Sequence, residues 1–144
     1  MKTLRKEQLI PYLKGDVKVL LQQHVERGQF DHPYIVVGIT LPSDTVSLLS
    51  PNWTVKAFRI QDIRPILRPM SDLKKEINHE GEQFVPYNRL CDQTFFELHG
   101  PATQWPYHVI EQLIHWNFDV FNLIPEGLAV DINKTVQLEP LVST

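Results

Sequence analysis

The sequence predicts an α+β domain in which an antiparallel β-meander of three to five strands packs against one long helix and one or two short helices. Val, Ile, Leu and Phe make up about a third of the 144 residues, which is enough to build a hydrophobic core. Eleven prolines divide the chain into pieces too short for a helical bundle. Apolar residues alternate in the first half and recur at helical spacing in the second half, so strands precede helices.

The strands are expected in the first half of the chain. Alternation over residues 17–26 predicts one half-buried strand, and a glycine-containing turn leads to a second strand over Tyr34–Leu41. Two shorter apolar runs, Val46–Leu49 and Trp53–Ile60, flank a proline-containing turn. Successive strands joined by such turns form an antiparallel meander.

Short helical segments are expected on both sides of this meander. Thr3 is placed to cap a helix over Leu4–Leu9, and the proline that follows would end it. Ser71 is placed to cap a second helix over Asp72–Asn78, and a single helical turn is expected near Tyr87–Cys91.

The longest predicted helix covers about Gln104–Asp119. Its apolar side chains recur at three- and four-residue steps and would face the sheet; they are Ile110, Leu113, Ile114, Trp116, Phe118 and Phe121. Beyond a break at Pro125–Gly127, residues Leu128–Ile132 form a last strand or an extended packing segment. The single domain spans residues 1–144 and ends in a polar tail from about residue 134. The predicted core consists of Val19, Leu21, Val37, Ile39, Ile60, Ile110, Leu113, Ile114, Phe118 and Phe121.

Several classes of protein are excluded. The longest nearly uninterrupted apolar run, Tyr34–Leu41, is too short to span a bilayer. The first residues are charged where a secretory signal needs apolar residues, so we expect a cytoplasmic protein. Cys91 is the only cysteine and can form neither a disulfide framework nor a thiolate-rich zinc site. It lies in a polar stretch without an evident histidine partner, so no catalytic thiol is predicted.

The net charge of −3 is unevenly distributed. Residues 1–52 carry +1, residues 53–75 carry +4 and residues 76–144 carry −8. The central segment is a candidate for contacts with nucleic-acid phosphates, through Lys56, Arg59, Arg64, Arg68, Lys74 and Lys75. We interpret these residues instead as lying near the acidic second half of the chain or as solvating one face, as most charge clusters do. The net acidity also argues against a dedicated duplex binder.

Two Arg-Pro steps lie within this basic segment, at Arg64-Pro65 and Arg68-Pro69. Proline restricts the backbone and arginine presents a forked donor, so the segment is expected to be extended or turned. It is interpreted as a rigid connector from sheet to helix whose arginines pair with carboxylates, with a peptide-like ligand for a partner as the alternative.

A polar face on the long helix is the best chemical candidate. It holds imidazole and carboxylate groups three and four residues apart, namely His108, Glu111, Gln112, His115 and Asp119. Such groups can share a divalent metal, or a carboxylate can orient a histidine as a general base. The usual zinc-helix spacing is absent, and so are a phosphate-binding glycine loop and a hydrolase elbow. We interpret the pattern as a solvated polar face, so no catalytic residue and no cofactor is assigned.

Two stretches of the chain, Arg64–Ile77 and Leu113–Asn133, resemble small uncharacterised proteins of Bacteroides-type bacteria, their prophages and phages. Residues Leu9–Leu21 resemble them more loosely. The strong resemblance covers about a quarter of the chain. It implies a cytosolic protein carried by mobile elements, and it assigns no activity or binding residue.

These observations favour a non-catalytic accessory or interaction protein. The alternatives are a small enzyme or metal-binding protein that uses the histidine face, and a nucleic-acid-associated protein that uses the basic segment. The expected partner is another protein or a second copy of the chain; a membrane and nucleic acid are not the expected partners. Its contacts are expected at Trp105 and Tyr107, large rings beside the start of the long helix. Trp105 could instead staple the chain onto that helix.

Overall fold

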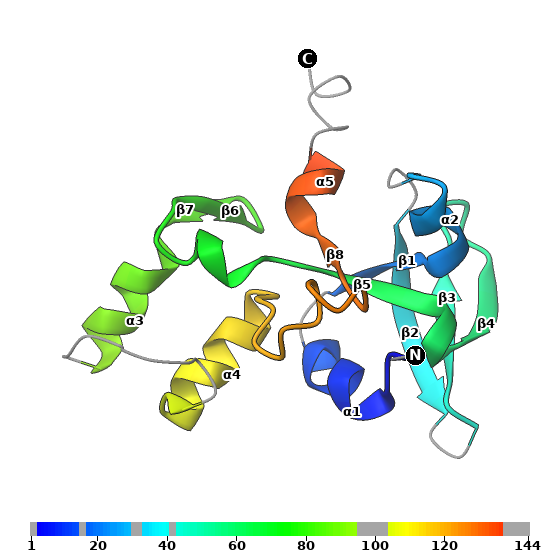
Figure 1. Cartoon of the computed structure of the whole chain (residues 1–144), viewed down its shortest axis with the longest axis horizontal. Coiled ribbons are helices and arrows are strands. Elements are labelled where there is room, and N and C mark those ends of the chain that lie inside the picture. The colour runs from blue at the N-terminus through cyan, green and yellow to red at the C-terminus, as the bar shows by residue number, and fades with distance from the viewer. Residues whose placement is uncertain (1–2, 15–16, 30–32, 41–42, 95–103, 137–144) are drawn as a thin grey trace.

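The computed structural model describes residues 3–14, 17–29, 33–40, 43–94 and 104–136. Its mixed α+β class agrees with the sequence, but the main sheet has six strands in the order β4-β3-β2-β1-β5-β8 (Figure 1). Every pairing in this sheet is antiparallel except that of β5 with β8. The strands are β1 Lys18–Leu21, β2 Tyr34–Thr40, β3 Thr45–Leu49, β4 Val55–Arg59, β5 Ile63–Leu67 and β8 Val130–Asp131.

The helices are short, and none of those in the described part of the chain is long and apolar enough to cross a membrane. They are α1 Lys6–Leu9, α2 Gln22–Glu26, α3 Pro86–Thr94, α4 Tyr107–His115 and α5 Ile132–Val136. Short 3₁₀ helices are formed by η1 Ile10–Lys14, η2 Ile60–Asp62 and η3 Met70–Asp72. A separate hairpin consists of β6 Ile77–His79 and β7 Glu82–Phe84. The polar tail is expected from about residue 134, but residues 134–136 belong to α5; from residue 137 onward the expected tail lies outside the described residues.

The first α-helix begins later than expected, but it ends at Leu9, before the proline, as expected. Its N-cap residue is Arg5, not Thr3, and the side-chain oxygen of Gln8 accepts a hydrogen bond of 2.9 Å from the backbone N–H of Arg5. Pro11 lies inside η1, which continues the helical path as a 3₁₀ helix. The prediction that Thr3 caps this helix is therefore wrong, because the side chain of Gln8, inside the helix, accepts the hydrogen bond at the N-cap.

The single strand predicted over residues 17–26 is wrong in its second half. Only β1 is extended, and the chain then forms α2. This helix places Val25 against a small cluster of Leu20, Ile66 and Val130 on one side of the sheet. Tertiary packing of Val25 thus overrides the local alternation.

A β-bulge in β2 reverses which side chains face the core. Val36 pairs with Leu48, but Gly38 pairs with Ser47, so one residue of β2 is left over between them. Val36 and Ile39 consequently pack on the main core, whereas Val37 is 52 % exposed. The prediction that Val37 belongs to the core is therefore wrong.

The segment interpreted as a connector is instead the buried strand β5. It pairs with β1 on one edge and with β8 on the other, and all of its residues are buried. In Figure 1, β5 extends from the main sheet toward the part of the molecule that holds α3, α4 and the β6–β7 hairpin. A strand buried on both faces shows no alternation, which is why its pattern is not recognisable in the sequence.

The helix predicted over Asp72–Asn78 is also wrong. Only a 3₁₀ turn forms there, and β6 then pairs with β7 through a two-residue loop. The loop residues Glu80 and Gly81 have φ of 52° and 84°, the positive values that a type I′ hairpin turn requires. Gly81 therefore lies in a hairpin turn and not beyond the end of a helix.

The long helix ends four residues earlier than predicted. The N–H of Asn117 bonds to the carbonyl of Ile114 and that of Phe118 to the carbonyl of Leu113, each at 2.9 Å. Asn117 has a φ of 63°, so these bonds form a Schellman-type end for α4. Leu113 and Phe118 are fully buried as predicted, but Phe121 lies beyond the helix and is 39 % exposed.

The core consists of two main clusters. The first lies under the main sheet and includes Leu9, Tyr12 and Leu48. The second lies between α3, α4 and the β6–β7 hairpin and includes Leu90 and Phe118. Ile114 is half-buried and packs against both, so α4 connects the two parts of the molecule.

Candidate functional site

The histidine face of α4 is exposed. His108, Glu111 and His115 line an open pocket of about 440 Å³ together with Tyr107. Apart from Pro11, every described lining residue comes from α4. One polar ring from a second element approaches this face among the described residues: the imidazole of His79 in β6 lies 6.2 Å from that of His115, between ring centroids. The described lining brings no polar side chain from another element toward His108 and Glu111, whereas a catalytic site needs several converging polar groups.

Asp119, the fifth member of the predicted polar face, is not on the helix. Its carboxylate is buried and accepts hydrogen bonds from the backbone N–H groups of Leu123 at 2.7 Å and Ile124 at 2.8 Å. Burial raises the pKa of Asp119, while these two hydrogen bonds oppose the rise. Among the residues that the structure describes, no group of three or more His, Cys, Asp or Glu side chains is arranged to hold a metal ion.

Arg64 stabilises the sheet from within. Its side chain is 7 % exposed, and it donates hydrogen bonds to the carbonyl oxygens of Gly127 at 2.9 Å, Gln61 at 2.9 Å and Ile63 at 2.7 Å. Burial lowers the pKa of Arg64, and the charge of Asp62 opposes this shift. The guanidinium is therefore engaged by backbone carbonyls, not by the carboxylates expected from the sequence.

Arg68, the residue that directly follows β5, is also buried and bonded to backbone carbonyls. It is 9 % exposed and donates to the carbonyl oxygens of Trp116 at 3.3 Å and Asn78 at 2.8 Å. Burial lowers the pKa of Arg68, and the charge of Asp72 opposes this shift. Arg68 thus connects β5 to both α4 and the β6–β7 hairpin.

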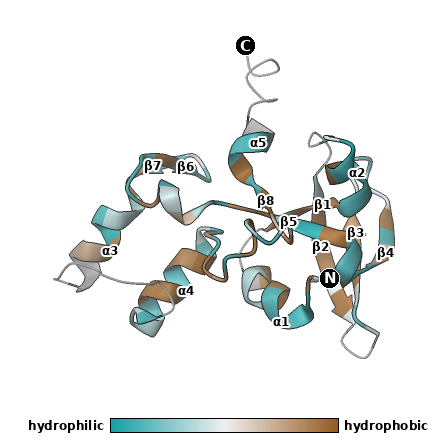
Figure 2. Cartoon of the chain, viewed as in Figure 1, coloured by the Kyte–Doolittle hydropathy of each residue, from teal (hydrophilic) through white to brown (hydrophobic). Residues whose placement is uncertain are grey.

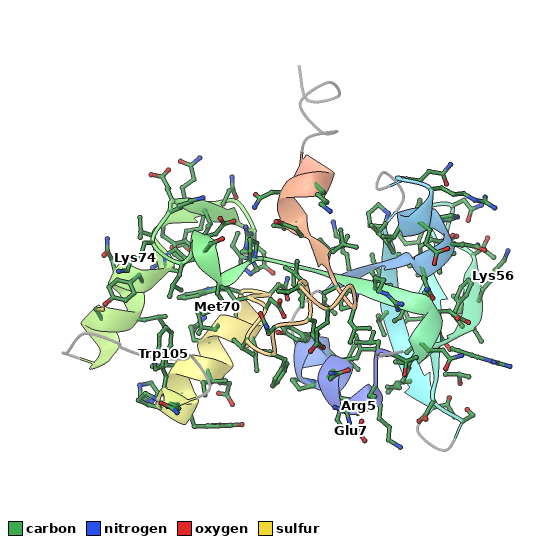
Figure 3. All side chains as sticks on the ribbon, in the orientation of Figure 1. Arg5, Glu7, Lys56, Met70, Lys74 and Trp105 are labelled. Atoms are coloured by element: carbon green, nitrogen blue, oxygen red, sulfur yellow. The ribbon has the colours of Figure 1, made fainter. Side chains whose placement is uncertain are left out.

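The remaining basic residues do not form one stripe. Lys74 lies over the ring of Tyr87, 4.8 Å from its centroid, and Lys75 pairs with Asp72 at 3.4 Å. Lys56 lies on β4, and Figure 3 shows it at the opposite end of the molecule from Lys74. The six candidates for phosphate contacts are therefore two buried arginines and two separate exposed pairs, Lys74 with Lys75 and Lys56 with Arg59.

The two aromatic candidates beside α4 differ in their surroundings. Trp105 is half-buried and packs against the second core cluster, as a staple would. Tyr107 is 74 % exposed. Cys91 is half-buried within α3.

An apolar surface that the sequence analysis did not identify lies on the main sheet. We call it the open face; it is the side of β2, β3 and β4 that points away from the first core cluster. Ile35, Leu49 and Val55 form one row across the three strands. Ile35 is 48 % and Val55 is 57 % exposed. Trp53, in the loop that joins β3 to β4, is 82 % exposed.

The same side of the sheet is covered farther along. Over β1, β5 and β8, the side chains of Leu20, Ile66 and Val130 are buried beneath Val25 of α2 and Ile132 of α5. Among the residues that the structure describes, none covers β2 to β4 in this way. Figure 2 shows hydrophobic segments on these strands at the edge of the molecule.

The surroundings of the open face are cationic. Strands β2, β3 and β4 contain no acidic residue, while Lys56 and Arg59 lie on β4 and Lys18 of β1 pairs with Ile35. The nearest acidic residues in sequence all lie beyond the strand ends: Asp44 directly precedes β3, while Asp31 and Asp62 lie three residues from β2 and β4.

Comparison of the chain with models of protein families, with curated proteins and with solved structures gives no match. The geometry of the exposed surfaces is therefore the basis for the function proposed next.

Proposed function

We propose that the chain is a non-catalytic interaction protein that binds another protein chain through the open face. The observation that carries this proposal is the apolar row in which Ile35 and Val55 are exposed and Leu49 between them is half-buried. Contiguous exposed apolar surface is costly in water and is typical of protein interfaces. Trp53 beside the row adds a large aromatic side chain of the kind that anchors interfaces.

The alternatives have less support. On the histidine face of α4, His115 lies beside the ring of His79, but no group of three or more His, Cys, Asp or Glu side chains forms a metal site among the described residues. This weakens the proposal of an enzyme or metal-binding protein. Arg64 and Arg68 are buried on backbone carbonyls, which weakens the proposal of nucleic-acid binding. The resemblance of two segments to proteins of phages and prophages adds the proposal of a cytosolic accessory role in a mobile element.

Selection of random displayed peptides on the purified chain tests this function. The double variant Ile35→Thr with Val55→Thr reduces the apolar surface while keeping side chains suited to strands. We expect the selected peptides to bind this variant about tenfold or more weakly than the original chain, because each interaction loses buried apolar area.

Tyr107→Ser is the matched control because it removes an exposed aromatic side chain from α4. The selected peptides should bind it as they bind the original chain, and thermal unfolding should show that all variants are folded. The proposal is wrong if no peptide is selected, or if the selected peptides depend on Tyr107 and not on the open face.

A further inference from the structure

Strand β4 lies at one edge of the main sheet. It pairs with β3 on one edge, and no described residue pairs with its other edge. Four of its five residues are exposed, and only Phe58 is half-buried. The backbone N–H and C=O groups of a free edge are the template on which an extended peptide can add as a new strand.

The side chains of β4 specify what such a strand must carry. Val55 and Ala57 lie on the open face, where they follow Leu49 and Ser47 of β3. Lys56 and Arg59 are the only charged residues of β4, and both are exposed. Opposite charges on directly paired positions stabilise a sheet and like charges destabilise it.

A recess at the Arg59 end of β4 extends this cationic surface. It has a volume of about 460 Å³, and its lining includes Arg5 and Lys6 as well as Arg59. Two acidic residues, Glu7 and Asp44, also line it, and the carboxylate of Asp44 pairs with Lys6 at 3.4 Å. Three cations against two carboxylates leave the lining with a net positive charge. Figure 3 shows Arg5 at the start of α1, on the same side of the molecule as Glu7.

We propose that the partner is an acidic, extended peptide segment that adds to the free edge of β4 as a further antiparallel strand. This proposal rests on the proposed function of the open face. Residues that face Val55 and Ala57 are apolar, and residues that face Lys56 and Arg59 are acidic. In antiparallel pairing, the first residue of the segment faces Arg59 and the fifth faces Val55. From its amino end the segment is therefore acidic, unrestricted, apolar, acidic and apolar. A further acidic residue that precedes these five lies toward the recess.

A second copy of the chain is a poorer occupant of this edge. Pairing of β4 with itself would bring Lys56 and Arg59 from both copies to one seam, together with no acidic residue from either strand. Repulsion between these charges opposes self-association, whereas the same charges attract an acidic segment. Charge complementarity is therefore what selects the acidic peptide.

Fluorescence anisotropy with a labelled peptide, Glu-Glu-Thr-Val-Glu-Val with blocked ends, tests the proposal on the full chain. We expect binding that weakens as salt is added. The charge-reversed variant Lys56→Glu with Arg59→Glu should bind it about tenfold or more weakly. The peptide Lys-Lys-Thr-Val-Lys-Val should show the opposite preference and bind the reversed variant better than the original chain.

The variant Lys74→Glu with Lys75→Glu is the matched control. It changes the net charge by the same amount at the other end of the molecule (Figure 3), and it should bind the acidic peptide like the original chain. Lys56→Gln with Arg59→Gln removes the cations without adding acids, and an intermediate loss of affinity is expected. This variant keeps the test valid if the reversed one does not fold.

Three results would overturn the proposal: equal binding of the acidic peptide to the original and the charge-reversed chain, equal losses in the reversed and control variants, or a dimer in sedimentation that Val55→Thr abolishes. Failure of the proposed function is distinguishable from this. If the selected peptides depend on Ile35 and Val55 but contain no acidic residue, the proposal of an acidic partner is wrong and the proposal that the open face binds a protein stands. If the binding of the selected peptides does not depend on Ile35 and Val55, both proposals are wrong.

Discussion

The hydroxyl group of Tyr12 donates a hydrogen bond of 2.6 Å to the carbonyl oxygen of Phe118 and accepts one of 3.3 Å from the backbone N–H of Val120. Tyr12 belongs to the core cluster under the main sheet, and Phe118 belongs to the cluster beside α4. Burial raises the pKa of Tyr12, so its hydroxyl stays protonated as the donor. One buried side chain from the first helical segment thus fixes the position of the chain after α4.

Tyr12→Phe should lower the free energy of unfolding by about 1–3 kcal/mol, because the carbonyl of Phe118 and the N–H of Val120 lose a buried partner. Urea denaturation measures this change. Tyr107→Phe is the control, since Tyr107 is 74 % exposed and its substitution should stay within about 0.5 kcal/mol. Equal effects of the two substitutions would contradict the role of Tyr12.

Arg68→Met should also destabilise the fold. The variant keeps the apolar length of the side chain but leaves the carbonyl oxygens of Asn78 and Trp116 without their donor. The expected loss is about 1–3 kcal/mol for each buried carbonyl that stays unsatisfied. Lys74→Met, at an exposed position, should change the stability by less than about 1 kcal/mol in the same urea experiment. A stable Arg68→Met variant would show that these bonds are not needed.

Asp119→Asn tests the balance between burial and hydrogen bonding at that carboxylate. Because burial raises the pKa of Asp119 above its ordinary value of 3.8, the folded chain holds the proton to higher pH than the unfolded chain. Its contribution to stability is therefore fully present below pH 3.8 and is lost as the pH rises through the raised value. The asparagine variant lacks this dependence.

The stability difference between the original chain and Asp119→Asn should accordingly be largest near pH 4 and smaller at pH 7. Urea denaturation across this range measures it. A difference that grows with pH would mean that the bonds from Leu123 and Ile124 hold the pKa below its ordinary value.

The meander could be predicted from the sequence because its signals are local. Alternation identifies β2 and β3, and the turn before Trp53 separates β3 from β4. Strand β5 could not be predicted, because it is buried on both faces and its partner β8 lies about sixty residues later. The end of α4 was missed because the apolar spacing continues past Asn117, which alone adopts the left-handed conformation there.

The candidate site was only partly visible in the sequence. Trp53, Lys56 and Arg59 can be identified by residue type, since rings beside turns and clustered cations are recognisable. The exposure of Ile35 cannot be predicted from the sequence. Alternation shows that the strand has two faces, but it does not show which face the rest of the chain covers. The bulge at Gly38 reverses the pattern further along the same strand, and a glycine within a strand is the one signal that indicates it.

Amide hydrogen exchange of the full chain, with and without the acidic peptide Glu-Glu-Thr-Val-Glu-Val, tests the central claim most directly. A strand added to β4 turns its outward N–H groups from water to peptide carbonyls and slows their exchange. We predict slower exchange in Val55–Arg59 and unchanged exchange in the β6–β7 hairpin at the other end of the molecule. Slower exchange confined to α4, or none in β4 at peptide saturation, would contradict the proposal that this edge receives the partner.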